Sequence, residues 1–261
     1  MRFLTFVALT LIPMVCPAQE WRDFKGQFTF VGDIPKRKEI VVDNDRGHLP
    51  KDHRFYDESL LVNEKNRGIA NILIWVIPDP DKPDAKMPIH PSYTMAPPAE
   101  HVIKVQKLIL SPHVSIMRTD AKKLLIINED PIGHNIDISS PEIPASCRSP
   151  APNGRDTWDI KKQTKLPAQV SCFIHPHEKA YLLVRDNPYF AVTNDQGVFE
   201  MKNLPVGEWR FKAWHEKSGY ITEVTLGKLK HNWPKGEFKI KIDKFDAFLG
   251  AIEVPDRLFN K

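Results

Sequence analysis

Prolines interrupt almost every periodic stretch of this sequence, and this feature restricts the fold more than any other. The 261 residues include 23 prolines against 12 glycines. A proline ring fixes φ and removes a backbone donor, so it ends helices and central strands and favours stiff turns. Short alternating or apolar runs lie between these breaks. The pattern predicts an all-β fold of many short strands, with no helix longer than two turns.

The apolar content is sufficient for a buried core. Hydrophobic residues make up 41% of the chain and aromatic residues 10%, which suits one large or two modest domains. The continuous apolar run Ile69–Ile77 ends at Pro78 and predicts a central strand that is covered on both faces. Residues 78–100 hold seven prolines and are expected to form an extended surface insertion.

The first 18 residues have the pattern of a secretory signal peptide. A basic start precedes the apolar stretch Phe3–Val15, and small residues precede a cut before Gln19. We therefore expect export to the periplasm or the extracellular space. Cys16 allows a lipoprotein, but bulky Val15 stands where a small residue is preferred. No apolar stretch approaches twenty residues, so no transmembrane segment is predicted.

Charge gives no indication of a nucleic-acid or lipid partner. The 37 basic and 33 acidic residues leave a net charge of +4 and are spread along the chain, with no long run of one sign. The stretch 43–57 is charged and irregular. Its two histidines, His48 and His53, are expected to be solvated.

The stretch Val170–Tyr181, VSCFIHPHEKAY, is the strongest candidate for a functional site. It places Cys172 three residues before His175, in a loop that Pro176 stiffens between two apolar, β-rich segments. A thiolate and an imidazole at this spacing can bind one metal ion. The alternative is a buried thiol beside a hydrogen-bonded loop histidine.

Two other features bear on this site. Gly133-His134-Asn135 follows the predicted strand 123–128 and a turn, so a further histidine stands at the start of the next strand. Removal of the signal peptide leaves Cys147 and Cys172 in an oxidising compartment, where two cysteines can form a disulfide. A disulfide would compete with a metal thiolate at Cys172.

The order of these motifs resembles that of the cupredoxins. It is similar to exported, plastocyanin-like proteins of the methylamine-utilisation type, whose pattern is Asn-x-Asp-Pro-x-x-His-Asn, Cys-x-x-His-Pro-Trp-Met, Asp-x-Pro-Tyr-x-Ala-Val-Thr and Trp-His-Glu. The corresponding stretches here are NEDPIGHN at 128–135, CFIHPHE at 172–178, DNPYFAVT at 186–193 and WHE at 214–216. The specific match covers residues 124–221, and the hairpins at 194–209 resemble carboxypeptidase-regulatory-like β modules.

The resemblance implies a cupredoxin-like Greek-key β-sandwich with an additional small β-sandwich subdomain. The expected division is a signal peptide at 1–18, a cupredoxin-like domain at 19–185 with the proline-rich insertion near 78–100, and a carboxypeptidase-regulatory-like β subdomain with C-terminal strands at 186–261.

The resemblance also implies a copper site. His134, Cys172 and His175 correspond to the three equatorial ligands, with His177 and Asn135 next to them. Glu178 stands where the family has its axial methionine, and His177 where it has tryptophan. A carboxylate there favours the oxidised ion and lowers the potential. Copper is the expected ion and zinc is less favoured. The expected role is electron transfer with a redox partner protein, not enzymatic catalysis.

Two other functions remain open from the sequence. The first is a metal-free extracellular β-sandwich that binds carbohydrate or protein and contains a Cys147–Cys172 disulfide. The second is a metalloenzyme that uses His177, Glu178 and His215 around an ion with an open position.

Overall fold

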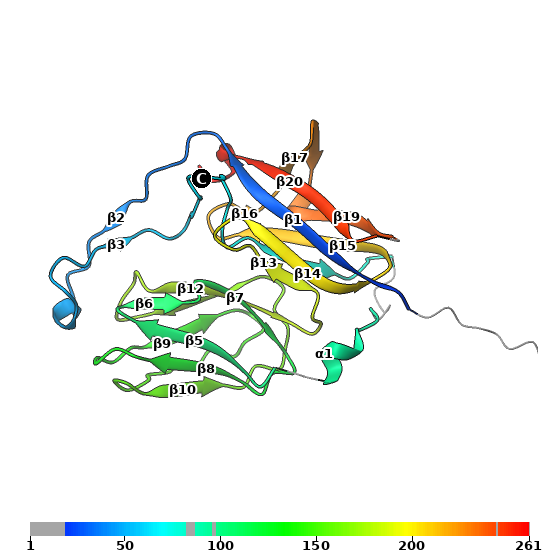
Figure 1. Ribbon diagram of the computed structural model, residues 1–261. Coiled ribbons are helices and arrows are strands. Elements are labelled where there is room, and N and C mark those ends of the chain that lie inside the picture. Colours follow the sequence, from blue (N-terminus) through cyan, green and yellow to red (C-terminus); the bar gives the residue numbers. More distant parts are fainter. Residues whose placement is uncertain (1–18, 82–86, 96–97, 244, 261) are drawn as a thin grey trace, which may run out of the picture.

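The structure, a computed structural model, describes residues 19–81, 87–95, 98–243 and 245–260. The predicted signal peptide lies outside the described residues. The strands form two β-sandwiches, one above the other in Figure 1, with only short helical segments among the residues described. The prediction of an all-β fold is confirmed.

The lower part of Figure 1 is a cupredoxin-like sandwich formed by residues 100–185. One sheet has the order β10-β8-β5-β6 and the other the order β7-β12-β11-β9, as far as the described residues show. The pairs β5–β8 and β7–β12 are parallel. The strands are β5 (Glu100–Gln106), β6 (Ile109–Ser111), β7 (Val114–Arg118), β8 (Lys123–Asn128), β9 (Ile136–Ser139), β10 (Arg155–Trp158), β11 (Ala168–Cys172) and β12 (Lys179–Arg185).

The upper part is a second sandwich, which combines both ends of the chain. Within the described ranges one sheet has the order β14-β1-β20-β17-β18, and the other has the order β13-β4-β15-β16, with β19 also on β15. Its core is rich in aromatic side chains, among them Phe24, Phe28, Phe199 and Phe211. The strands are β1 (Trp21–Val31), β4 (Leu73–Ile77), β13 (Phe190–Val192), β14 (Val198–Pro205), β15 (Gly207–His215), β16 (Gly219–Tyr220), β17 (Glu223–Leu226), β18 (Leu229–Asn232), β19 (Glu237–Ile242) and β20 (Ala247–Pro255).

The structure corrects the predicted domain boundaries. β1 and β4 were assigned to the cupredoxin-like domain at 19–185, but β1 pairs with β14 and β20, and β4 pairs with β13 and β15. The amino-terminal strands therefore complete the second sandwich, which is not a small subdomain of residues 186–261 alone. The physical reason is that strand pairing is non-local: an apolar face can be buried against any strand that reaches it.

The apolar run at 69–77 joins the two sandwiches. Ile72, Ile74 and Val76 belong to the core of the second sandwich. The alternate side chains Leu73 and Trp75 instead pack with Val114 of β7 and Leu183 of β12. Because successive side chains of a strand point to opposite faces, both faces of β4 are buried, as predicted from its continuous apolar sequence.

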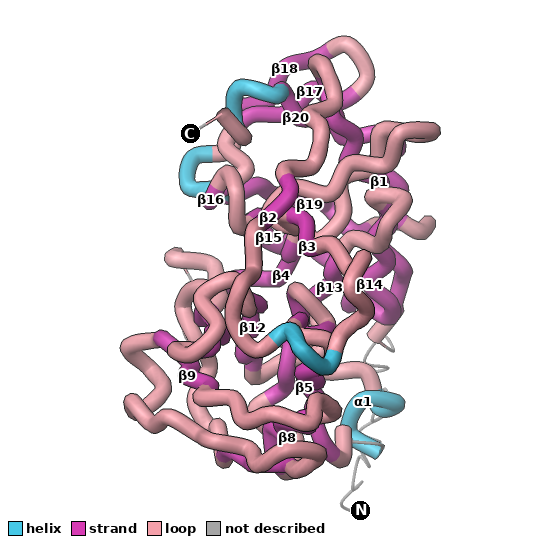
Figure 2. The backbone as a smooth tube through the Cα atoms, turned by 90° about the vertical axis from the view of Figure 1, so that its left-hand side faces the viewer, coloured by secondary structure: helices cyan, strands magenta, loops and turns pink. Residues whose placement is uncertain are grey.

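An arm of residues 35–59 leaves the second sandwich after β1 and extends along the cupredoxin-like sandwich. Figures 1 and 2 show it passing beside β12 and returning, with the short strands β2 (Glu39–Ile40) and β3 (Phe55–Tyr56) paired. Val42 and Phe55 of the arm pack on Leu108, and all three are buried. The arm is therefore fixed against the lower sandwich by apolar contacts.

The proline-rich insertion lies partly outside the described residues, at 82–86 and 96–97. Its described part includes the five-residue helix α1 (Pro91–Met95), and the hydroxyl of Tyr93 donates a hydrogen bond to the carbonyl of Lys202 at 2.9 Å. None of the helices in the described part of the chain is both long and apolar enough to cross a bilayer.

Candidate metal centre

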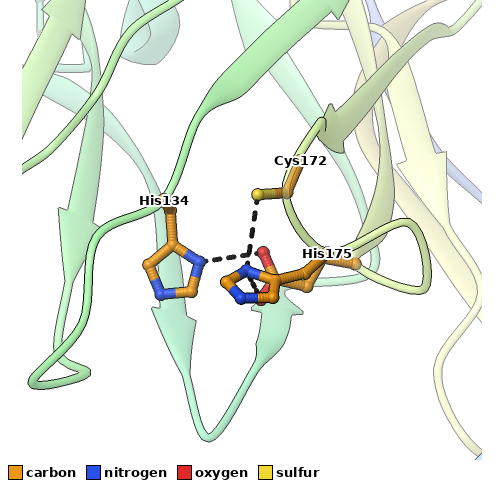
Figure 3. Close-up of side chains that lie close together, drawn as sticks. His134, Cys172 and His175 are labelled. Carbon is orange, nitrogen blue, oxygen red and sulfur yellow. Dashed lines mark hydrogen bonds and ion pairs between the residues drawn. The ribbon is translucent and has the colours of Figure 1, made fainter. Parts of the chain in front are cut away.

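Four donor side chains meet at one end of the cupredoxin-like sandwich. His134 lies in the turn between β8 and β9, Cys172 is the last residue of β11, and His175 and Glu178 lie in the loop before β12. Figure 3 shows the imidazoles and the thiol directed toward one point. The donor atoms of the four residues all lie within 4.8 Å of one another.

The distances define a compact group in which both imidazoles present the same nitrogen. Nδ1 of His134 lies 3.0 Å from Oε2 of Glu178. Nδ1 of His175 lies 3.1 Å from Oε1 of Glu178 and 3.6 Å from Sγ of Cys172. Each histidine therefore has its Nδ1 inside the group and its Nε2 outside it.

Backbone hydrogen bonds hold the loop in this shape. The N–H of Glu178 donates to the carbonyl of His175 at 2.9 Å, and the N–H of Cys172 to the carbonyl of Glu178 at 3.3 Å. The neighbouring loop is attached by Asn135, whose carbonyl accepts from the N–H of Phe173 at 2.9 Å. The N–H of Asn135 points at Sγ of Cys172, 3.4 Å away. Asn135 thus lies directly beside Cys172 and joins the turn of His134 to the loop of His175.

A buried asparagine fixes the turn that carries His134. The side-chain amide of Asn128 donates to the carbonyls of Ile132, Pro150 and Ala151 at 2.7, 3.2 and 3.0 Å, while its oxygen accepts from the N–H of Asp130. These bonds join the turn to the loop around residue 150. His134 is therefore positioned by a network that extends well beyond its own strand.

The group is almost completely removed from solvent. The exposed fraction is 1% for His134, 3% for Cys172, 2% for His175 and 1% for Glu178. Burial lowers the pKa of His134, but hydrogen bonds to Cys172 and Glu178 and the charges of these groups outweigh it and raise the pKa to about 9. Without an ion, the imidazole of His134 is therefore protonated at neutral pH.

The residues fit a metal ion. Oε1 of Glu178 is buried and accepts no hydrogen bond, although it lies within the group. A buried acceptor of this kind is costly unless a cation or a donor satisfies it. Two imidazoles, a thiolate and a carboxylate match copper, and the same set can also hold zinc in a tetrahedral arrangement.

His177 is beside the group but does not point into it. Its Nε2 donates to the carbonyl of Leu108 at 3.1 Å, and its ring lies 5.2 Å from that of Phe55 and 6.3 Å from that of His175. Burial lowers the pKa of His177, so the ring is neutral. Its contact with His175 is therefore one of packing.

The structure does not contain the arrangements that the two other hypotheses require. Cys147 and Cys172 are both free thiols, the first exposed and the second buried, so the disulfide of the metal-free alternative is not formed. His215 lies in the second sandwich against Phe259 and is not among the residues of the donor group. Its burial lowers its pKa to about 3. The set His177, Glu178 and His215 is therefore not one site in the described structure.

Three residues next to the site were not found from the sequence. Oδ2 of Asp45, in the arm, lies 3.1 Å from Nε2 of His175. Asp130 lies 3.5 Å from Nε2 of His134, and His48 lies 3.5 Å from Asp130. His48 was expected to be solvated, but both of its ring nitrogens are buried. No periodicity links the arm to the metal loop in the sequence, so only the fold could reveal this contact.

A cavity of 610 Å³ lies beside the site, between the arm, the metal loop and the second sandwich. Its lining includes His113 and Glu216, which form an ion pair, and also His177 and Glu178. Because Glu178 is only 1% exposed, the cavity borders the donor group without opening it to solvent.

The fold and the site together define an all-β protein in which a cupredoxin-like sandwich carries a buried His–Cys–His–Glu group. No protein-family model matches the chain, and no curated protein matches it. Several solved structures are similar to part of the chain. A copper-containing nitrite reductase from Thermus scotoductus SA-01 is 15% identical with a TM-score of 0.31, over 38% of this chain and 27% of that one.

Two variants of amicyanin in the Cu(I) form are also similar. One is 12% identical with a TM-score of 0.30, over 35% of this chain and 88% of amicyanin; the other is 10% identical with a TM-score of 0.30, over 39% and 95%. The chain spans about a quarter of the nitrite reductase. Similarity at these scores carries no conclusion about activity, metal or partner, so function has to be inferred from the site.

Proposed function

We propose that the protein binds one copper ion through His134, Cys172, His175 and Glu178 and transfers electrons through it outside the cytoplasm. The observation that supports this most directly is the convergence of four buried donors within 4.8 Å. A bound copper ion would supply a one-electron redox couple. A rigid set of nitrogen and sulfur ligands lets the electron move with little rearrangement.

Glu178 distinguishes this site from one with an axial thioether. Its two oxygens lie 3.0 and 3.1 Å from the Nδ1 atoms of His134 and His175, close enough to share an ion with both. A carboxylate stabilises Cu(II) more than Cu(I) and so lowers the reduction potential. We propose a low-potential copper site of modified type 1 character, with zinc as the competing ion.

Electron transfer is favoured over catalysis by the burial of the donors. No donor residue is more than 3% exposed, so a substrate has no direct approach to the ion. An electron can reach the ion through the protein without such an approach. The exposed side chains of Phe173 and Ile174, between Cys172 and His175 in the chain, give a redox partner protein an apolar contact beside the site. Export, inferred from residues 1–18, would place that partner in the periplasm or outside the cell.

Copper uptake by the purified protein without residues 1–18 tests the proposal. We expect one Cu(II) per chain and an intense visible absorption band from charge transfer between the Cys172 thiolate and copper. The band should be lost in Cys172→Ser. Cys147→Ser is the matched control, because Cys147 is an exposed thiol outside the donor group, and it should retain the band. Uptake without a thiolate band, or equal spectra for the two variants, would contradict the proposal.

Zinc can be distinguished in the same preparation. If Zn(II) at equal concentration displaces copper completely, the site is a zinc site rather than a redox centre. If copper is retained and can be reduced and reoxidised reversibly, the electron-transfer role is supported.

A further inference from the structure

The arm brings a carboxylate to the outer nitrogen of one candidate ligand. Oδ2 of Asp45 lies 3.1 Å from Nε2 of His175, the nitrogen that faces away from the donor group. The Asp45 side chain is 51% exposed, whereas that of His175 is 1% exposed. Asp45 therefore links the buried outer nitrogen of His175 to the solvent-exposed surface of the arm.

The geometry of the arm supports a defined position for Asp45. The residue has φ 56° and ψ 16°, in the left-handed region that aspartate, asparagine and glycine tolerate best, and it precedes the helical turn Arg46–His48. The guanidinium of Arg46 donates to the carbonyl of His53 at 2.9 Å and so ties the two sides of the arm together. Asp45 is thus presented by a turn whose shape is fixed locally.

Apolar contacts anchor the same turn to the cupredoxin-like sandwich. Val42 and Phe55 flank it in the chain and pack on Leu108, where their exposed fractions are 6% and 4%. The ring of Phe55 also contacts His177 in the metal loop. The arm is therefore attached on both sides of Asp45, which restricts how far the carboxylate can move from His175.

The second histidine has a related arrangement. Asp130 accepts hydrogen bonds from the N–H groups of Lys107 and Leu108 at 2.6 and 2.8 Å, which fix its carboxylate. Its Oδ2 lies 3.5 Å from Nε2 of His134, and its Oδ1 lies 3.5 Å from Nε2 of His48 in the arm. The outer nitrogens of both histidines thus face carboxylates. The arm supplies the carboxylate beside His175 and approaches the carboxylate beside His134 through His48.

We infer that the arm is part of the metal centre: Asp45 positions His175 with Nδ1 toward the ion, and the arm retains the ion by closing the site. The inference rests on the proposed metal function. A carboxylate that accepts the outer N–H of a ligand histidine fixes the ring and makes the other nitrogen a better donor. Loss of such a partner typically weakens metal binding by about 10- to 100-fold.

The test compares two substitutions at Asp45 with one elsewhere in the arm. Asp45→Gly removes the carboxylate without straining the positive φ, and Asp45→Asn keeps an acceptor of the same shape without the charge. Asp52→Asn removes one charge from an exposed position of the arm and is the charge-matched control. The measurement is the rate at which the copper-loaded protein loses its ion to an excess of chelator.

We expect Asp45→Gly to lose copper about 10- to 100-fold faster than the wild type, Asp45→Asn to be intermediate, and Asp52→Asn to be unchanged. A second readout needs no metal. The Nε2 proton of His175, observed by ¹⁵N-resolved NMR, should be protected from exchange in the wild type and in Asp45→Asn, and unprotected in Asp45→Gly.

The outcomes separate this inference from the proposed function. If the wild type binds copper and Asp45→Gly loses it no faster than Asp52→Asn, the retaining role of the arm is wrong and the copper site stands. If the wild type takes up no copper, the proposed function is wrong, and the NMR signal decides whether Asp45 positions His175. A His175 proton that exchanges equally fast in the wild type and Asp45→Gly overturns the positioning role.

Discussion

Replacement of Glu178 should raise the reduction potential of the copper site. Glu178→Gln keeps the shape of the side chain and removes its charge, while Glu178→Met supplies the thioether that the related motif carries. The carboxylate interacts with one more positive charge in Cu(II) than in Cu(I). Its removal therefore destabilises the oxidised state and makes reduction easier.

The magnitude follows from the geometry of the donor group. Because all four donor atoms lie within 4.8 Å of one another, an ion at their centre lies about 3 Å from each. One unit charge at about 3 Å, with an effective dielectric constant of about 20, contributes about 5.5 kcal/mol, which corresponds to about 0.24 V for a one-electron couple. We expect an increase of about 0.1 to 0.2 V in Glu178→Gln, because the neutral amide still presents an oxygen dipole.

A redox titration followed by the thiolate-to-copper absorption band provides the measurement. Glu142→Gln is a suitable control, since Glu142 is a carboxylate of the same sandwich that interacts with Ser140 and lies outside the donor group. The control should keep the wild-type potential. If both Glu178 variants bind copper with an unchanged or lower potential, the carboxylate does not face the ion as the structure indicates.

Three further predictions concern stability. Burial lowers the pKa of His215 to about 3, so below pH 6.5 the unfolded chain binds a proton at this residue that the folded protein does not. The free energy of unfolding should therefore fall by about 2 kcal/mol between pH 6.5 and 5 because of His215. The melting temperature of His215→Gln should depend less on pH in that window than that of the wild type. Trp75→Ala should lower the free energy of unfolding in urea by about 3–5 kcal/mol, because Trp75 is 1% exposed between the sandwiches; a loss below 1 kcal/mol would contradict this packing. Asn128→Ala should lower the free energy of unfolding by about 1–3 kcal/mol, because the carbonyls in the turn of His134 lose the side-chain amide that donates to them. The same substitution should weaken copper binding in a competition assay.

The class of fold and the four residues of the donor group could be predicted from the sequence. A continuous apolar run at 69–77 predicted a strand buried on both faces, and β4 is buried between two cores. Cys172, His175 and Glu178 lie within one short segment, so their proximity in space could be predicted from their spacing in the sequence. The turn at 133–135 was harder, because His134 comes from another strand, and its inclusion depended on the resemblance to a known pattern.

Pairing between distant segments could not be predicted in the same way. The strand β1 alternates between buried and partly exposed residues, but this pattern does not specify that β14 and β20 are its neighbours. The arm has still less signal, because Val42 and Phe55 are isolated apolar residues in a charged stretch. Their partner Leu108 lies more than fifty residues away. Asp45 therefore resembled any exposed acid until the fold placed it against His175.

The arm also determines what counts as one functional unit in this chain. By its connections it belongs to the second sandwich, since it leaves β1 and the chain then continues to β4. By its contacts it is part of the site in the cupredoxin-like sandwich, since Asp45 contacts His175 and Phe55 contacts His177. Residues 100–185 transplanted alone would carry every candidate ligand and lack the groups that enclose them. A transplant that keeps the whole site must therefore include the arm, and with it the strands β1 and β4 that anchor the arm at its two ends.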